Sequence, residues 1–428
     1  MGCGTQEVSR CRRPARSDSV TSLVISMPRF ALFFLAISLM HFVVRGAETS
    51  ATSVLSRIQY SFKLGLIGDA LALGGHYEYD AKKIKLSGGY ADYAKPGEAN
   101  NGIGWGTANY HPGKVAGDMT DAGEVAVMLL KNIVEDKSYS FDSYASFWKK
   151  QIDEGYGSCN FQSVGRDAKG CPPGLKPGYI NGGSRRTLQA LATNPTAKGN
   201  ARKALAANVN CLIAATHFLP LFLLAGDSKP DEESMVADAV STVYISHNNP
   251  DPLAACEFLT RTLYRMFYDN MPLPEALQFS AAKMNHQLIN KWLSDAQNKV
   301  TEATDPNSAL SKEEFVDDIA ITSMSRLWDI GKSEPIKIGK ASPTEGALPS
   351  ALYFALKYQD NIEAGLIANA NCGGDSAARG IVIGMLLGAQ THEVQLPSTH
   401  RWMTGLNIMK QVESLMEALL PASSFKEL

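Results

Sequence analysis

The chain has 428 residues, of which 45% are hydrophobic and 20% are charged, and its formal net charge at pH 7 is −2. This composition supplies enough apolar surface for a large core, and the charge is too low and too mixed for a disordered protein. The near-neutral balance gives no electrostatic basis for binding DNA or RNA, so nucleic acid is not an expected partner.

Residues 1–46 have the pattern of a leader. Several arginines precede a mainly apolar run at residues 30–44. The run is shorter than the roughly 20 residues that cross a bilayer, and it is followed by short residues, as in a cleaved signal peptide. We therefore expect a protein of the secretory pathway or a secreted one, with no stable membrane span after cleavage. A membrane anchor at residues 30–44 and an organellar leader are the alternatives.

Helical periodicity dominates the rest of the chain, where apolar residues recur three or four positions apart and strand signals are sparse. Two segments rich in glycine, residues 88–117 and 155–183, are expected to be surface insertions between helices. The pattern predicts a single all-α domain over residues 48–428, with helices at 53–73, 118–134, 201–224, 235–245, 252–268, 273–294, 315–327, 349–356 and 376–389.

Glycines recur at every fourth position, 380, 384 and 388, along the last of these predicted helices. Each costs roughly 1 kcal/mol relative to alanine inside a helix. Three on one face therefore predict a buried helix that crosses a neighbour at close range. A membrane role for the stripe is disfavoured because the segment is short and carries Arg379.

Five cysteines remain once the leader is set aside, so at least one thiol is left over. Cys159 and Cys171 could form a disulfide across the second irregular segment. The alternative is a pair of unbonded loop cysteines.

Three segments combine acidic or hydroxyl side chains with glycine turns. They are Gly68-Asp69-Ala70-Leu71, the run from Gly117 to Glu124, and the run from Asn371 to Gly380. Asp121 and Asp375 each lie where a helix begins, so either one alone could be an ordinary capping or first-turn carboxylate.

Taken together, the three segments resemble in order and spacing the signature regions of the ADP-ribosylglycohydrolases. Those regions are an early Gly-Asp-Ala-Leu, a Thr-Asp-Asp-Thr turn and a late Gly-Gly-Asp-Thr-Asp-Thr. Residues 181–184 and 246–250 are similar to two further family segments, Asn-Gly and Thr-His-x-x-Pro. The resemblance implies a single orthogonal multi-helix bundle. It also implies hydrolysis of an N- or O-glycosidic bond of an ADP-ribose-type ligand with the help of two Mg²⁺ ions.

Carried over by position, the resemblance makes Thr120, Asp121 and Asp375 metal ligands. Alanines stand at the other three side-chain ligand positions, 122, 377 and 378. Mg²⁺ prefers rigid oxygen coordination, so we expect an altered magnesium site that is weak or partial. Substitute carboxylates close in sequence are Asp118, Glu124 and Glu78.

His76 stands where the family's early motif has a glutamate, seven residues after Asp69. A histidine there could act as general base, although a lone histidine is more often a hydrogen-bonded structural residue. We take His76, Asp69 and Glu78 as candidate catalytic residues.

The departures from the family pattern resemble the branch that contains the J-type crystallins and selenoprotein J. They include Tyr77 and the Tyr110-His111-Pro112-Gly113 segment. Cys372 is then a candidate counterpart of a selenocysteine, and a nearby helix N-terminus would lower the pKa of its thiol. An inert buried cysteine is the plainer interpretation.

Two classes of function follow. The retained Thr120, Asp121 and Asp375 favour a divergent hydrolase that takes an ADP-ribose-type ligand. The three alanines favour a non-catalytic structural or storage protein that resembles the J-type crystallins. A cysteine-dependent redox protein is a third possibility.

Overall fold

The structure is a computed structural model that describes residues 53–96, 111, 114–155, 179–324, 327–328, 336–390 and 397–419. All of them fall in one unit of the chain, Thr52–Leu428. The leader at residues 1–46 and the cysteines Cys159 and Cys171 lie outside the described residues, so the expectations about them stay predictions.

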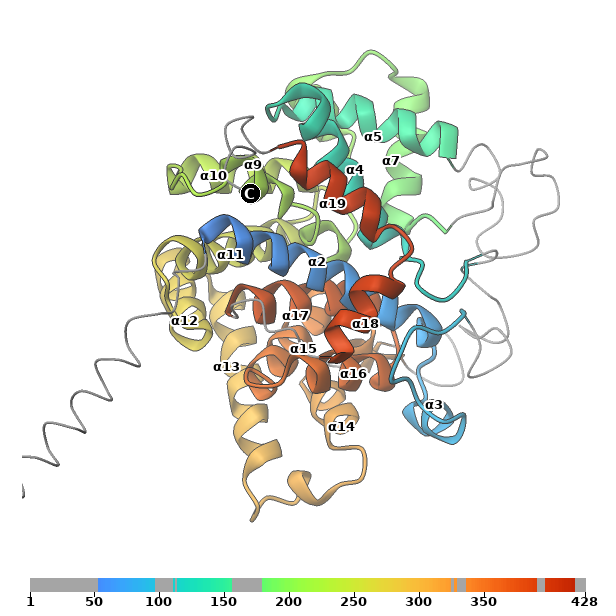
Figure 1. Ribbon diagram of the computed structural model, residues 1–428, viewed down its shortest axis with the longest axis vertical. Coiled ribbons are helices and arrows are strands. Elements are labelled where there is room, and N and C mark those ends of the chain that lie inside the picture. The colour runs from blue at the N-terminus through green and yellow to red at the C-terminus, as the bar shows by residue number, and fades with distance from the viewer. Residues whose placement is uncertain are drawn as a thin grey trace, which may run out of the picture. The chain divides into compact units, whose positions relative to one another are not determined.

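Helices make up nearly all of the regular structure, which confirms the all-α prediction (Figure 1). Among the described residues there is one two-stranded antiparallel ladder, β1 (Leu327–Trp328) with β2 (Ile336–Lys337). The helices, labelled as in Figure 1, are α2 (Val54–Ala72), η1 (Leu73–Gly75), α3 (Ala81–Leu86), α4 (Asp121–Asp136), α5 (Phe141–Gly155), α7 (Gly182–Thr193), α8 (Gly199–Ala204), η2 (Leu212–Ala215), α9 (Pro220–Ala225), α10 (Glu232–Val243), α11 (Pro250–Tyr268), α12 (Leu273–Met284), α13 (Gln287–Thr304), η3 (Leu310–Lys312), α14 (Val316–Ser323), η4 (Ile338–Lys340), α15 (Thr344–Lys357), α16 (Ile362–Cys372), α17 (Ser376–Gln390), α18 (Pro397–Gly405) and α19 (Met409–Glu417).

Helices α2 and α17 pack against each other, backbone to backbone, at the centre of the fold. A Cβ atom on Gly384 would lie only 2.1 Å from the carbonyl oxygen of Leu64, and one on Gly388 would lie 2.7 Å from Cα of Ser61. The hydroxyl of Ser61 also donates a 2.6 Å hydrogen bond to the carbonyl of Met385. The prediction that the glycine stripe marks a buried helix in close contact with a neighbour is therefore confirmed.

Two of the expected long helices are broken. The span 201–224 is divided into α8, η2 and α9, and Pro220 begins the last of these. The span 273–294 is divided into α12 and α13 because Asn285 takes a left-handed backbone conformation, with φ of 47°. The spacing of apolar residues did not predict either break, because each of the new helices also buries an apolar face.

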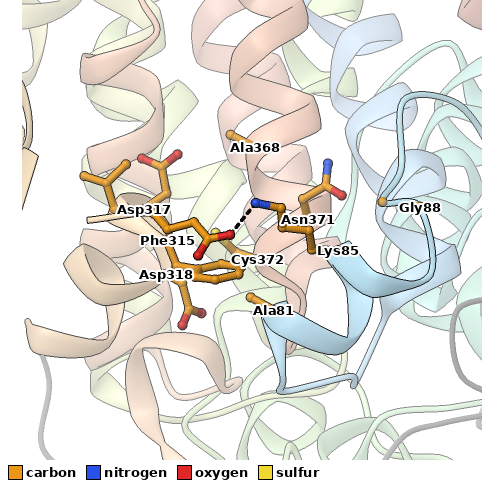
Figure 2. Close-up of a pocket in the computed structure, with 12 residues that line it drawn as sticks. Ala81, Lys85, Gly88, Phe315, Asp317, Asp318, Ala368, Asn371 and Cys372 are labelled. Carbon is orange, nitrogen blue, oxygen red and sulfur yellow. Dashed lines mark hydrogen bonds and ion pairs between the residues drawn. The ribbon is translucent and has the colours of Figure 1, made fainter. Parts of the chain in front are cut away.

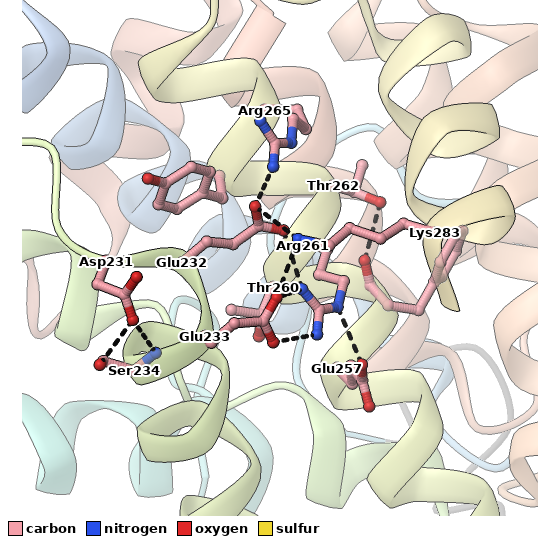
Figure 3. A network of polar contacts seen from close by, with 12 residues as sticks. Asp231, Glu232, Glu233, Ser234, Glu257, Thr260, Arg261, Thr262, Arg265 and Lys283 are labelled. Carbon is pink, nitrogen blue, oxygen red and sulfur yellow. Dashed lines mark hydrogen bonds and ion pairs between the residues drawn. The ribbon is translucent and has the colours of Figure 1, made fainter. Parts of the chain in front are cut away.

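An ion-pair network joins α10, α11 and α12 (Figure 3). The guanidinium of Arg261 lies 3.0 Å from Glu232 and 2.6 Å from Glu233, and Lys283 contacts both carboxylates at 2.9–3.0 Å. Arg261 also pairs with Glu257 one turn earlier on α11. Because several of these groups are partly shielded and share partners, the network connects three helices more firmly than isolated surface pairs would.

Among the described residues, no helix is long and apolar enough to span a membrane.

The α2–α17 contact generates a prediction about Gly384. Replacing Gly384 with alanine should destabilise the protein by about 1–3 kcal/mol, because the new methyl group would press on the backbone of α2. Gly65 is the matched control, since a Cβ there would meet Ile381 at an ordinary 3.5 Å. Gly65→Ala should be neutral or stabilising by up to about 1 kcal/mol. Urea melts measure both, and equal midpoints for the two variants would contradict the close contact.

Candidate functional site

The first and third motifs meet through a short backbone pairing. His76 and Gly374 form a parallel bridge, and the N–H of Tyr77 donates to the carbonyl of Gly374 at 2.7 Å. Gly374 has a φ of 73°, and a Cβ there would lie 2.2 Å from the carbonyl oxygen of Lys340. Only glycine fits this position, and the turn places Asp375 beside His76.

Asp69 joins the first motif to the second. Its buried carboxylate accepts hydrogen bonds from the Thr120 backbone N–H (2.8 Å), the Thr120 hydroxyl (2.6 Å) and the Gly123 N–H (3.3 Å). Thr120 in turn caps α4 by accepting from the N–H of Ala122. Burial raises the pKa of Asp69 to about 6, although the bonds from Thr120 oppose the shift. The structure thus places this candidate catalytic residue where it supports the start of α4.

Asp121, the first residue of α4, is held by the Asn181 turn. It accepts hydrogen bonds from the backbone N–H and the side-chain amide of Asn181, at 2.9 and 3.0 Å. Asn181 also caps α7 by accepting from the N–H of Ser184. Burial raises the pKa of Asp121 to about 6. The segment that resembles the family's Asn-Gly turn therefore has a direct contact with a predicted metal ligand.

A chain of hydrogen bonds runs through His76. Its Nε2 lies 3.0 Å from Oδ1 of Asp375, and its Nδ1 lies 2.7 Å from Nε2 of His111. All three side chains are buried. Burial and then the neighbouring His76 hold the pKa of His111 well below its usual value. His111 was not among the predicted site residues. It lies in an irregular segment, where the spacing of apolar residues does not predict which side chains will be in contact.

Two tyrosines complete the cluster. The ring of Tyr77 stacks on His76 with 3.9 Å between centroids, and the ring of Tyr179 meets Tyr77 and His111 edge-on at 5.8 and 5.7 Å. Burial raises the pKa of both tyrosines above the usual value, and the charges of Asp121 and Asp375 raise them further. Both carboxylates therefore lie close to the same pair of phenols, and the three motifs converge on one polar cluster.

The other acidic candidates have local roles. Glu78 is buried, and its Oε1 accepts from the N–H of Asp80 at 2.7 Å. Asp118 accepts from the N–H of Val115 and from the side chain of Asn407, at 2.8 and 2.9 Å. Glu124 pairs with Lys114. None of these bonds places the three carboxylates together as a substitute ligand set.

Cys372 differs from expectation. It is the last residue of α16, at the negative end of a helix, so the expected lowering of its thiol pKa is wrong. Burial raises the pKa of Cys372, and the charge of Asp317 raises it further. The thiol lines a separate pocket of about 250 Å³ (Figure 2) between α3, the start of α14 and the end of α16. A redox role for Cys372 stays a prediction, without support from a lowered pKa.

Comparison with known proteins assigns the family. The family model for ADP-ribosylglycohydrolase matches residues 50–427, which is most of the chain. The chain belongs to the ADP-ribosylglycohydrolase family. A solved structure described as an ADP-ribosylglycohydrolase-related protein complex matches with a TM-score of 0.49 and 18% sequence identity, over 86% of this chain and 98% of that chain. A comparison with curated proteins found no match.

The residues present do not fit the magnesium pair that resemblance to this family implies. Ala122, Ala377 and Ala378 occupy three ligand positions, and all three are buried. Of the retained carboxylates, Asp121 is bonded to Asn181 and Asp375 to His76. Within the described ranges, no group of three or more His, Cys, Asp and Glu side chains is arranged to hold a metal ion. Two carboxylates would leave half of the charge of two divalent ions uncompensated.

A prediction about magnesium follows. Restoring the carboxylates with Ala122→Asp and Ala377→Asp should destabilise the metal-free protein, because four clustered carboxylates repel one another. Mg²⁺ should reverse the loss by about 2.7 kcal/mol at 100 times its dissociation constant. The unfolding free energy of the wild type should not respond to Mg²⁺. Calorimetric titration and thermal melts measure both effects.

Ala389→Asp is the control for this test. Residue 389 is also buried on α17 but lies more than three turns from residue 377. This variant should lose stability without recovering it in Mg²⁺. Tight binding of two ions by the wild type would show that other residues have replaced the missing ligands.

Proposed function

We propose that this protein is a divergent glycosidic-bond hydrolase that takes an ADP-ribose-type ligand at this polar cluster and uses His76 with Asp375 in place of a magnesium pair. The proposal rests on one observation, the buried 3.0 Å contact between His76 Nε2 and Asp375 Oδ1 at the point where the three motifs meet. A histidine oriented by a carboxylate is a common arrangement for a general base.

In the proposed reaction, His76 first accepts a proton from water and then donates one to the leaving group. With Asp375 ionised, Nε2 of His76 carries the proton of their hydrogen bond, since a carboxylate only accepts. Nδ1 is then the acceptor, and it contacts His111 in this ligand-free protein. A water that takes the place of His111 at Nδ1 would lose a proton to it and attack the anomeric carbon. The bond to the leaving nitrogen or oxygen breaks, and the proton held by His76 passes to the leaving group.

The aromatic rings of the polar cluster support a nucleotide-like ligand. Tyr77 and Tyr179 present ring surface beside the two carboxylates, and the guanidinium of Arg185 lies 5.8 Å from the ring centroid of Tyr179. Aromatic faces stack on planar bases, and an arginine next to them suits a phosphate.

The expected activity is release of ADP-ribose from ADP-ribosylated peptides with N- or O-linkages, at equal rates in EDTA and in Mg²⁺. His76→Gln should reduce the rate by about 100-fold or more, within the range of general-base catalysis. His400→Gln, an exposed histidine on α18, is the matched control and should leave the rate unchanged. Chromatographic detection of free ADP-ribose measures the rates. Turnover that disappears in EDTA would contradict a metal-independent reaction.

A second function, a non-catalytic structural or storage protein, is favoured by the buried alanines 122, 377 and 378. Thermal melts with ADP-ribose separate the two proposals. A bound ligand at 100 times its dissociation constant adds about 2.7 kcal/mol to the stability of the folded state. No turnover together with an unchanged melting temperature would favour the structural protein. The finer likeness to J-type crystallins and selenoprotein J stays a prediction from the sequence.

A further inference from the structure

The backbone of Tyr77 is strained. Its φ of 68° lies in the left-handed region that bulky residues rarely adopt. The other non-glycine residues with positive φ in the described ranges are two asparagines, which tolerate it, and Lys137, at the C-cap of α4. The strain at Tyr77 is maintained by the 2.7 Å bond from its N–H to the carbonyl of Gly374, immediately before Asp375.

This conformation has a direct effect on the side chains. Neighbouring residues in extended backbone point to opposite sides, and His76 itself is extended, with φ of −61° and ψ of 124°. The left-handed turn at Tyr77 instead brings its ring back over His76, 3.9 Å between centroids and 22° between planes. His111 lies beside His76, with 20° between the ring planes and 2.7 Å between Nε2 of His111 and Nδ1 of His76. The ring of Tyr179 packs edge-on against the ring of Tyr77, with 69° between the two ring planes.

We propose that Tyr77 is a positioning residue whose strained backbone clamps the imidazole of His76 between Asp375 and His111. An imidazole can rotate about its side-chain bonds, and only one ring plane allows Nε2 to face Asp375 while Nδ1 faces His111. The stacked ring of Tyr77 selects that plane. This inference rests on the proposed function for its catalytic meaning, whereas the clamping of the ring can be measured without any activity.

The test is the ring ¹⁵N signals of His76 in protein labelled with [¹⁵N]histidine and assigned with His76→Gln. Tyr77→Phe keeps the stacked ring and should preserve the wild-type shifts, although it loses a hydrogen bond with Tyr179. Tyr77→Leu keeps the bulk but not the flat ring, and it should move both ring signals toward those of a solvent-exposed histidine. Unchanged His76 shifts in Tyr77→Leu would overturn the proposal.

Strain is tested separately with Tyr77→Ala and Tyr77→Gly, which both lack the ring. Glycine adopts φ of 68° without penalty, so the glycine variant should melt at the higher temperature although glycine usually stabilises less than alanine. Lys137→Gly, the matched control, should also raise the melting temperature but leave the His76 signals and any turnover unchanged. A glycine variant that melts below the alanine variant would show that the backbone at residue 77 is not strained.

Activity provides the third readout. If the wild type hydrolyses its substrate, Tyr77→Leu should lower kcat by about tenfold or more, because a misplaced base slows the reaction of bound substrate. Loss of the ring surface offered to the ligand would show separately, as a rise in KM. Tyr77→Phe should restore most of the rate. Altered ¹⁵N shifts in a protein without turnover would reject the proposed hydrolase and leave the clamp intact. Unchanged shifts in an active enzyme would reject the clamp alone.

Discussion

The backbone contact between Gly68 of α2 and Gly380 of α17 is the constraint on which the site depends. A Cβ on Gly68 would lie 2.1 Å from the carbonyl oxygen of Gly380, and a Cβ on Gly380 would lie 2.3 Å from that of Gly68. Asp69 directly follows the first glycine, and Asp375 directly precedes α17. The same contact therefore sets the separation of two motifs that are about 300 residues apart in the chain, a separation that loop closure alone would leave unspecified. A side chain at either glycine would force the helices apart and separate the carboxylates together with them.

Much of this helical framework could be predicted from the sequence, because the periodic spacing of apolar residues and glycines indicates which helix faces are buried. Amphipathic spacing located α2, α11 and α17, and the cost of glycine in a helix indicated that the stripe on α17 faces a close neighbour. Helix breaks were harder to predict. The left-handed Asn285 between α12 and α13 interrupts the backbone without interrupting the apolar pattern, so spacing alone merges two helices into one.

The site was predictable only in part, for a different physical reason. Asp121 and Asp375 could be located because motifs place them at helix starts. Asn181, which binds Asp121, and His111 and Tyr179, which contact His76 and Tyr77, come from turns or irregular segments. There, neither a period nor a fixed spacing indicates which residue will be reached. The pKa of Cys372 was misjudged because α16 was not among the predicted helices. This helix ends at Cys372 and directs its negative end toward the thiol.

Charge compensation explains how the polar cluster can keep its buried carboxylates. An unpaired buried charge is costly, so each carboxylate requires donors or cations. Asp69 and Asp121 receive hydrogen bonds from backbone and side-chain groups of neighbouring turns, and Asp375 receives His76. Behind Asp375 lies Arg379, fully buried on the first turn of α17, whose Nη2 donates to the carbonyl of Gly373 at 2.6 Å.

Burial lowers the pKa of Arg379, and the charge of Asp375 counteracts that shift. Asp375 is thus hydrogen-bonded to an imidazole from the end of η1 and interacts electrostatically with a guanidinium from α17. Both groups are fixed by the backbone pairing of residues 76 and 374 and by the α2–α17 contact. The negative charge of Asp375 is therefore stabilised by groups of the protein itself, and these groups are held by the same two glycine-dependent contacts that build the fold.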